Sequence, residues 1–423
     1  MTSALLDRLS KLFTTVLAAL EGERGVWVVG GAVRDLLLGL DPGDLDLVVE
    51  GDALPVARRA AARLGGDVVV HDRFGTATIR GAGIAFDLAG ARRETYARPG
   101  ALPEVELGAP LEEDLARRDF TVNTLALRLA DGTLTGWPGA QDDLAARVLR
   151  VLHEGSFRDD PTRLLRMARY AARLGFAVEP RTAELAEAAV AEGALATVTA
   201  ERLGAELRLL AREPQPGALE ELARFGLGAA LLPGFDVDAP LVGRAVALCG
   251  EVPGAGEVAG RDEAVPVGQA ARSSAGVGGV ASPRADLVAL GAAVRRADAV
   301  DLAARLRELA FPANEAAAVV ACAGVDALVA ELDGAAPSAA DLVLRRRPLE
   351  AAALAAADGS EPARDWLRRG RHQRLAITGD DLLAAGLSGP AVGRALQAAR
   401  AALLDGAAPD REAQLAAALA PPR

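Results

Sequence analysis

The sequence has 423 residues, of which 51% are hydrophobic and only 3% aromatic, and its formal net charge is −11. This length is enough for more than one domain with a sizeable core. The acidic balance argues against a broadly basic nucleic-acid-binding protein, although it leaves local basic strips open.

Other features narrow the class. Long Ala/Leu/Arg/Glu stretches predict a largely helical chain. No run of about 18 uncharged apolar residues is present, so we expect no membrane span. The N-terminal segment MTSALLDRLSKLF lacks the apolar core of a signal peptide, which predicts a cytoplasmic protein. Cys249 and Cys322 have no histidine nearby, so we expect neither a disulfide framework nor a zinc site.

The segment VWVVGGAVRDLLLGLDPGDLDLVVE, residues 26–50, contains the first predicted elements. The apolar run Val26–Val29 indicates a buried strand, and Gly30 and Gly31 allow a tight turn with close backbone approach. Helical character follows over residues 32–38. A glycine pair between a strand and a helix N-terminus is a natural seat for phosphate.

Two aspartates follow this turn. In a strand, alternate residues share a face, so Asp44 and Asp46 point the same way while Leu45 and Leu47 point into the core. Neighbouring carboxylates repel unless a cation lies between them, and Mg²⁺ accepts one or two carboxylates together with substrate phosphates. A lone Asp-x-Asp is more often an exposed acidic strand face. Joined to Gly-Gly-x-x-Arg-Asp at this spacing, it indicates a phosphate and metal site.

These residues resemble a known family. GGAVRD followed by DLDLVV is similar to the signature of the polymerase-beta-type nucleotidyltransferases, in the class that contains bacterial CCA-adding enzymes and bacterial poly(A) polymerases. The resemblance implies Mg²⁺ held by Asp44 and Asp46, and a triphosphate bound by Arg34 and by the glycine pair of Gly30 and Gly31.

The following residues complete the expected head, residues 1–141. Strands are predicted at 67–71, 74–79 and 84–88, and a Gly-Ala-Gly turn joins the last two. Asp87 lies in the third of these strands. It is either a third catalytic carboxylate offered by a neighbouring strand or an edge-strand aspartate that faces solvent.

Residues 91–113 are polar and broken by proline and glycine, which predicts a long, mobile functional loop. In the resembled family a loop in this place helps the last, adenosine-adding step. Its presence therefore favours an enzyme that adds A.

The string LARRDFTVNTLAL comes next. Two arginines beside an aspartate either face a triphosphate and sugar hydroxyls or form an ordinary helix N-terminal cap. The string is similar to the family motif RRDFTxNALA. By that match Arg118 grips the triphosphate, while Asp119 and Asn123 shape the pocket around the ribose.

We expect a helical neck over residues 142–213. In SFRDDPTRLLRMARYAARLGF, helical spacing places apolar residues on one side and arginines on the other, a pattern that is commonly a solvated face. Asp160 lies one turn before Arg163, and this acceptor and donor suit the Watson–Crick edge shared by C and A but not that of U or G. The family's Glu/Asp-Asp-x-x-Arg motif implies that both read the base, while Arg166 and Arg169 bind the nucleotide.

Residues 214–333 and 334–423 are expected to form an all-α body and tail, the tail binding tRNA. The segment 250–284 is rich in Gly, Ala, Val and Ser, which predicts a disordered or poorly packed insertion. Ile377–Gly406 resembles the tail of bacterial CCA-adding enzymes. Its glycines either meet a phosphate backbone or only end helices.

The expected fold is α+β: a nucleotidyltransferase head with a small mixed sheet, followed by an elongated all-α neck, body and tail. The resemblance implies addition of CCA to the 3′ end of tRNA from CTP and ATP, with Mg²⁺ as cofactor. Three alternatives remain: an enzyme that adds only A or only CC, a poly(A) polymerase, and a non-catalytic RNA-binding protein on the same scaffold. No protein partner is indicated.

Overall fold

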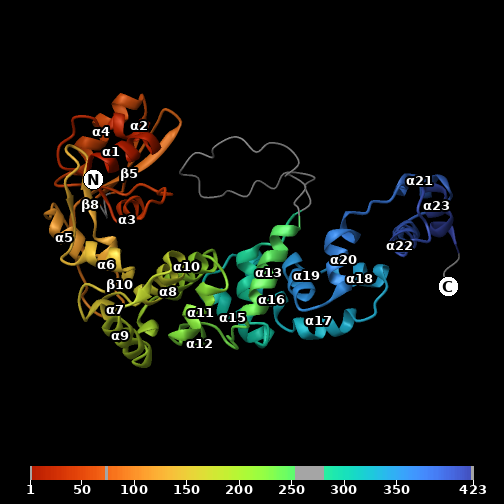
Figure 1. The fold of residues 1–423 in the computed structure, drawn as a ribbon. Helices are drawn as coiled ribbons and strands as arrows, with labels where there is room; N and C mark the ends of the chain where they lie inside the picture. The colour runs from red at the N-terminus through yellow and green to blue at the C-terminus, as the bar shows by residue number, and fades with distance from the viewer. Residues whose placement is uncertain (1, 72–74, 253–280, 421–423) are drawn as a thin grey trace. The chain divides into compact units, whose positions relative to one another are not determined.

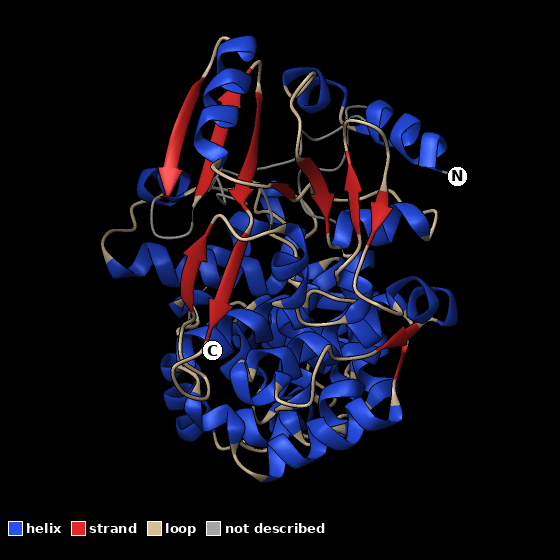
Figure 2. Ribbon diagram, turned by 90° about the vertical axis from the view of Figure 1, so that its left-hand side faces the viewer, coloured by secondary structure: helices blue, strands red, loops and turns tan. Residues whose placement is uncertain are grey.

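The computed structural model describes residues 2–71, 75–252 and 281–420, so most of the expected insertion lies outside the described residues. The described chain forms two compact units, the first ending at Thr199 and the second beginning at Ala200. Every strand of the described residues belongs to unit 1, and unit 2 is helical there (Figures 1 and 2). The expected fold class, a mixed-sheet head followed by helices, is confirmed. The finer division at residues 141, 213 and 333 stays a prediction.

A seven-stranded sheet forms the centre of unit 1, in the order β3-β4-β5-β2-β1-β8-β9. It is mixed because β2 runs parallel to β5 while the other neighbours are antiparallel. Its strands are β1 (Val26–Val29), β2 (Leu47–Val49), β3 (Asp67–His71), β4 (Thr76–Gly81), β5 (Ile84–Gly90), β8 (Ala126–Arg128) and β9 (Leu134–Thr135). The interior strand β1 is buried along its whole length, as its apolar sequence predicts.

The segment expected to be a loop, residues 91–113, contains a β-hairpin. Strands β6 (Arg92–Thr95) and β7 (Glu104–Leu107) pair antiparallel, and Arg93 forms an ion pair of 2.8 Å with Glu106 directly opposite. At the tip, the Gly100 amide donates to the carbonyl oxygen of Arg158, and a Cβ on Gly100 would clash with Thr197. The hairpin tip is therefore packed against the neck.

Helices complete unit 1. The first are α1 (Thr2–Leu12), α2 (Thr14–Ala19), α3 (Gly31–Leu37), α4 (Ala53–Leu64), α5 (Leu111–Ala116), the 3₁₀ turn η2 (Thr121–Asn123) and α6 (Ala140–Ala146). Next come β10 (Val148–Leu149), α7 (Ser156–Asp159), α8 (Thr162–Leu174), β11 (Ala177–Val178), α9 (Pro180–Ala191) and η3 (Ala194–Thr197). Gly175 ends α8 in the left-handed conformation, which glycine adopts readily.

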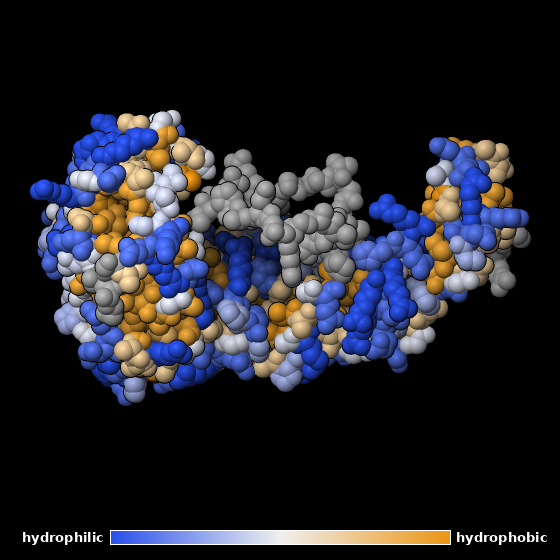
Figure 3. All heavy atoms as spheres, turned by 45° about the horizontal axis from the view of Figure 1, so that its top comes forward, coloured by the Kyte–Doolittle hydropathy of each residue, from blue (hydrophilic) through white to orange (hydrophobic). Residues whose placement is uncertain are grey.

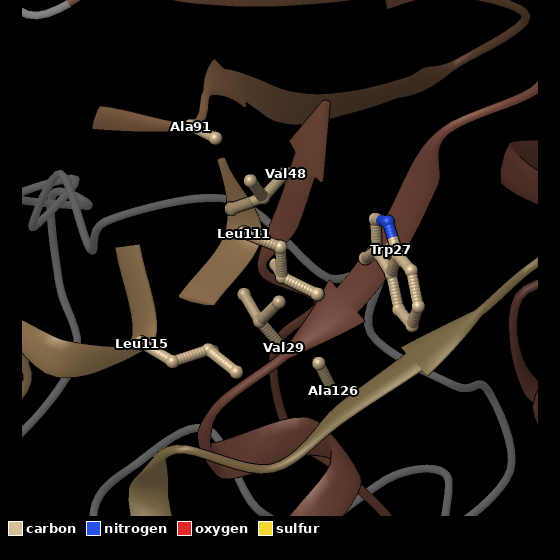
Figure 4. Close-up of a cluster of buried hydrophobic side chains, with 7 residues drawn as sticks. All are labelled: Trp27, Val29, Val48, Ala91, Leu111, Leu115 and Ala126. Atoms are coloured by element: carbon tan, nitrogen blue, oxygen red, sulfur yellow. The ribbon is translucent and has the colours of Figure 1, made fainter. Parts of the chain in front are cut away.

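One face of the sheet packs against α5. The buried cluster consists of Trp27, Val29, Val48, Ala91, Leu111, Leu115 and Ala126 (Figure 4). Val29, Leu111 and Leu115 point toward one another. Burying a leucine side chain stabilises a fold by roughly 1.5–3 kcal/mol, so this cluster holds α5 firmly on β1. The residues that follow α5 are thereby brought to the end of β1.

Unit 2 is built from helices. They are α10 (Ala200–Ala211), α11 (Gly217–Arg224), α12 (Leu227–Leu231), α13 (Ala239–Glu251), α14 (Ala285–Ala293), α15 (Ala299–Glu308), α16 (Ala313–Cys322) and α17 (Val325–Leu332). These continue with α18 (Pro337–Leu344), α19 (Leu349–Ala357), α20 (Glu361–Arg368), η4 (Gly370–His372), α21 (Gly379–Ala384), α22 (Pro390–Leu404) and α23 (Arg411–Leu419). Apolar side chains of α21, α22 and α23 share a small core.

The surface is mixed in character. Hydrophilic and hydrophobic side chains alternate over the visible face of both units (Figure 3). Within the described ranges, every helix is too short or too polar to cross a membrane.

Candidate active site

Gly30 brings three parts of the site together. It lies between the end of β1 and the first residue of α3, with φ 70° and ψ −131°, a conformation that side-chain-bearing residues rarely adopt. A Cβ at this position would lie 2.7 Å from Nη1 of Arg118 and 3.7 Å from Oδ2 of Asp46. The missing side chain therefore allows a guanidinium and a carboxylate to approach the same turn.

The two predicted aspartates precede β2 rather than lie in it. The strand begins at Leu47, and Oδ1 of Asp44 accepts from the amide of Leu45 at 2.8 Å. The carbonyl oxygen of Asp46 accepts from the amide of Val29 at 3.0 Å, which fixes the segment beside β1. The predicted alternation still holds: Leu45 and Leu47 are buried, and both aspartates are exposed.

The carboxyl group of Asp46 lies among charges of both signs. Protein packed around part of this side chain desolvates it and raises its pKa above the ordinary value. Arg118 and Arg166 act in the opposite direction, while the negative charges of Asp44 and Asp87 raise the pKa further. Carboxylates with this mutual repulsion are suited to binding a cation.

Asp87 lies on β5, the strand next to β2. Its Oδ1 accepts from Oγ1 of Thr78 at 2.6 Å, and the side chain is exposed. In the described part of the chain, no three His, Cys, Asp or Glu side chains are grouped closely enough to hold a metal ion by themselves. A metal here would therefore rely on Asp44 and Asp46 together with other ligands, such as substrate phosphates.

A buried aspartate orients both arginines of the RRD motif. Asp114, on α5, accepts from Nε and Nη2 of Arg117 at 3.0 and 2.8 Å, and from Nη2 of Arg118 at 3.1 Å. Burial opposes ionisation of Asp114, but the two guanidinium groups outweigh it and lower its pKa. Within the described residues, the buried Nε of Arg118 has no hydrogen-bond partner. This side chain therefore keeps a donor for a ligand.

A chain of buried hydrogen bonds connects the three sequence motifs. Arg34 donates to Asp35 through Nε and Nη2 and to Oδ1 of Asn123 at 2.6 Å. Asn123 donates to Oδ1 of Asp119 at 2.9 Å, and Asp119 binds Arg166 through Oδ2. Arg34 is only 2% exposed. Its expected direct grip on a triphosphate is not supported by this placement, since the side chain holds Asn123 instead.

Asp119 is the centre of this chain. Burial opposes its ionisation, yet the charge of Arg166 and the hydrogen bonds from Asn123 and Arg166 lower its pKa to about 2. Its Oδ1 also accepts from the amide of Phe120 at 2.8 Å. Both oxygens are occupied inside the protein. The expected role in shaping the ribose pocket is therefore indirect, through the groups that Asp119 holds.

Helix α8 does not present the open strip of arginines that its sequence suggests. Arg163 and Arg169 are 4% and 8% exposed, and Arg166 is partly buried. Arg163 donates to Oγ of Ser156 at 2.7 Å and to the carbonyl oxygen of Arg117 at 2.8 Å. The solvated-face interpretation is wrong for these residues, because helical periodicity does not reveal what packs against the polar side.

Asp160 connects α7 to α8. Its Oδ1 accepts from the amide and the hydroxyl of Thr162, at 3.1 and 2.7 Å, so it caps the first turn of α8. The predicted neighbour Arg163 follows on the same turn, with its amide donating to the carbonyl oxygen of Asp160 at 3.0 Å. The backbone therefore brings the expected base-reading pair together.

A cavity of about 260 Å³ lies beside Arg163. Its lining includes Arg93, Tyr96, Arg117, His153, Asp159 and Arg163. Burial raises the pKa of Tyr96 to about 12, so its hydroxyl stays protonated over the physiological range. The cavity is bounded by the hairpin segment, α5 and the neck, all within unit 1.

Sequence reasoning missed two residues of this site. Asp114 lies three and four residues before the paired arginines, and this helical spacing is the signal that could have identified it. Tyr170 lies within 6 Å of three guanidinium groups. The helical spacing of four residues from Arg166 is a local signal for one of these contacts, whereas Arg34 comes from a different helix and has no such signal.

Comparisons with known proteins agree with this geometry. Residues 26–150 match the poly A polymerase head domain family. The A-adding tRNA nucleotidyltransferase of Halalkalibacterium halodurans is 45% identical over 197 residues, 45% of this chain and 46% of that protein. The CC-adding enzyme of Deinococcus radiodurans is 46% identical over 217 residues, 49% of this chain and 55% of that protein. The chain thus spans about half the length of these curated relatives.

The similarity of fold extends further than that of sequence. The Thermotoga maritima CCA-adding enzyme, solved in complex with tRNA, is 27% identical, with a TM-score of 0.71. The match covers 99% of this chain and 98% of that one. The sheet of the head, the motifs joined within it and the helices of the remainder all agree with these comparisons. Residues 26–150 thus belong to the poly A polymerase head domain family, and the chain as a whole is similar in fold to CCA-adding enzymes.

Proposed function

We propose that this protein adds C and A nucleotides from CTP and ATP to the 3′ end of tRNA without a nucleic-acid template. The observation that carries the proposal is the approach of Asp46 and Arg118 to Gly30. A carboxylate for a metal and a guanidinium for a phosphate then lie on either side of a turn that has no side chain. Nucleotidyl transfer needs both groups at one phosphorus atom.

The cofactor in this proposal is Mg²⁺, held by Asp44 and Asp46. Both are exposed carboxylates, the hard oxygen donors that Mg²⁺ prefers, and their repulsion contributes to the raised pKa of Asp46. When bound, Mg²⁺ supplies activation of the attacking ribose hydroxyl and neutralises charge on the leaving pyrophosphate. Asp87 acts electrostatically on Asp46, which supports it as the third carboxylate of the site.

The triphosphate is bound by Arg118 and by the backbone at Gly31. The buried Nε of Arg118 is a donor without a protein partner in the described residues, as expected for a group that awaits an anion. Arg166 and Arg169 contribute positive charge from α8. Arg34, Asn123 and Asp119 bind no ligand directly in this proposal, because their hydrogen bonds fix the position of Arg166.

The base is read by Asp160 and Arg163. A guanidinium has five N–H donors, and Arg163 uses two of them for partners among the described residues, which leaves three for a ligand. Donation to a ring nitrogen and acceptance from an amino group by Asp160 fit C and A and exclude U and G. The cavity beside Arg163 offers space for the base.

The acceptor of the reaction is tRNA, as the names of the relatives suggest. The helical unit 2 would hold it by shape and backbone contacts, and the tail segment 377–406 belongs to this unit. An enzyme that adds only A is the second candidate, because the H. halodurans relative has that name. The CC-adding relative matches at a similar identity, so sequence identity does not separate these activities.

One assay tests these proposals. Purified protein, MgCl₂ and labelled CTP or ATP are incubated with tRNAs that end before CCA, after CC, or in complete CCA. Growth of the first tRNA by three nucleotides supports CCA addition, whereas extension of only the CC-ended tRNA, and only by A, indicates A addition. Long tails on complete tRNA would indicate a poly(A) polymerase. No incorporation at all would reject catalysis.

A further inference from the structure

Tyr170 lies close to the guanidinium groups of three arginines. It is on α8, and the Cζ atoms of Arg34, Arg166 and Arg169 lie 5.4, 5.6 and 4.7 Å from the centre of its ring. All three distances are within the range at which a guanidinium is attracted to an aromatic ring. A single tyrosine therefore serves as neighbour to arginines from two helices, α3 and α8.

The ring is itself fixed in place. Phe120, which is fully buried, meets Tyr170 edge to face, with ring centres 6.0 Å apart and planes at 86°. The Tyr170 hydroxyl accepts a hydrogen bond from Nη2 of Arg166 at 3.3 Å. Since Phe120 follows directly after Asp119, the aromatic contact and the Asp119–Arg166 ion pair join the same two segments.

The arrangement has an electrostatic consequence. Three guanidinium groups around one ring repel one another, and the negative π face offsets part of that repulsion. Arg34 has further support from Asp35 and Asn123. The charge of Arg166 also acts on the carboxyl group of Asp46 and lowers its pKa.

We propose that Tyr170 is a positioning residue, whose ring holds Arg166 and Arg169 in the orientation that binds the triphosphate of the incoming nucleotide. This inference rests on the proposed function. Tyr170 itself does not touch the reacting atoms. Its loss should therefore weaken nucleotide binding much more than it slows the chemical step.

Two variants separate the ring from its hydroxyl. Tyr170→Leu removes the ring and retains apolar volume, whereas Tyr170→Phe retains the ring and loses one hydrogen bond. A matched control is Phe311→Leu in unit 2, where the ring lies 5.1 Å from Arg208. That substitution removes a similar arginine–aromatic contact in the other unit. Melting temperatures of all variants show whether the fold is retained.

The readouts are KM and kcat for ATP and CTP with tRNA, and the affinity for inorganic tripolyphosphate by titration calorimetry. We expect Tyr170→Leu to raise KM about 10-fold and to weaken tripolyphosphate binding by a similar factor, with kcat within about 3-fold of the wild type. Tyr170→Phe should stay within about 3-fold in KM, and Phe311→Leu should leave all three values unchanged.

If the wild type is active and a folded Tyr170→Leu variant has unchanged KM and tripolyphosphate affinity, the role of Tyr170 is rejected. The proposed function is not affected by that result. Equal losses in the Leu and Phe variants would also overturn it, since the hydroxyl and not the ring would then matter. A wild type that transfers no nucleotide, with tripolyphosphate binding still lost in Tyr170→Leu, would reject the proposed function and leave the positioning role supported.

Discussion

Asp119, which is buried, and Arg166, which is partly buried, form an ion pair that joins the head to the helix of the neck. Nε of Arg166 donates to Oδ2 of Asp119 at 2.8 Å, and Nη2 lies 2.6 Å from the same oxygen. Hydrogen bonds through Arg34 and Asn123 connect this ion pair to the helix that follows the Gly-Gly turn. The position of Arg166 is thus set by residues of three separate motifs.

The low pKa of Asp119 predicts a pH-dependent contribution to stability. A carboxyl group whose pKa falls from 3.8 to about 2 on folding stabilises the protein above pH 4, and that contribution is lost as the pH falls toward 2. The shift corresponds to roughly 2 kcal/mol. Asp119→Asn should therefore reduce the free energy of unfolding by about this amount at pH 7, measured by urea denaturation.

The difference between wild type and Asp119→Asn should narrow as the pH falls below 4. Asp142→Asn, at an exposed aspartate of the same unit, is the control and should have little effect at any pH. If the difference in free energy of unfolding between wild type and Asp119→Asn stays constant from pH 7 to pH 3, lost packing and not ionisation explains the destabilisation.

The raised pKa of Asp46 predicts the opposite dependence of stability on pH. The metal-free protein loses stability as the pH rises from about 4 through the raised pKa, because the ionised form is disfavoured in the fold. Asp46→Asn should therefore raise the melting temperature at pH 7 without metal by a few degrees, while abolishing nucleotide incorporation.

Adding MgCl₂ and ATP should then stabilise the wild type more than Asp46→Asn in the same melting experiment. Asp44→Asn should lose activity as well. Substantial turnover in the Asp44→Asn, Asp46→Asn double variant would defeat the assignment of the metal to these carboxylates.

Gly30→Ala should inactivate the protein. The new Cβ would meet Nη1 of Arg118 at 2.7 Å and would require an unfavourable backbone conformation. A displacement of about 1 Å in a substrate-binding group can cost about 100-fold in rate, so we expect at least that loss in kcat/KM. Gly39→Ala is a matched control, because Gly39 also has a positive φ, 79°, but open space around its Cβ position.

Gly39→Ala should lower stability through backbone strain while retaining activity. If the two alanine variants lose activity equally, the steric explanation for Gly30 fails. If Gly30→Ala retains full activity, the approach of Arg118 to this turn has no part in binding.

Arg163→Ala should relax base selection. A two-point contact to a base contributes roughly 1–3 kcal/mol of discrimination, so the preference for CTP and ATP over UTP should fall about 5- to 150-fold. Ser156→Ala is the control, since it removes one internal partner of Arg163 and leaves the guanidinium in place. Unchanged selectivity in a folded Arg163→Ala variant would contradict the base-reading role.

The sequence predicted those parts of the fold that depend on local pattern. Strands β1 and β3 have the predicted bounds, because apolar runs act within a few residues. The hairpin after β5 was missed. Its charged residues read as a loop, yet opposite charges such as Arg93 and Glu106 face each other across the two strands.

The site was predicted at the level of motifs but not of contacts. Asp46 and Arg118, which come from two separate motifs, both lie near Gly30. Arg34 was expected to face the ligand, and its buried bond to Asn123 could not be foreseen, since the partners are 89 residues apart. Periodicity also cannot show that the arginine side of α8 is covered by the head.

The ion pair of Asp119 and Arg166 has a consequence for protein engineering. A chimera that takes its head from one relative and its neck from another, joined near residue 150, inherits the two halves of this contact from different parents. Such a chimera forms this ion pair only if both parents place the aspartate and the arginine at equivalent positions. A junction after Gly175 keeps the whole hydrogen-bonded chain in one parental sequence and is the better site for exchanging nucleotide specificity between relatives.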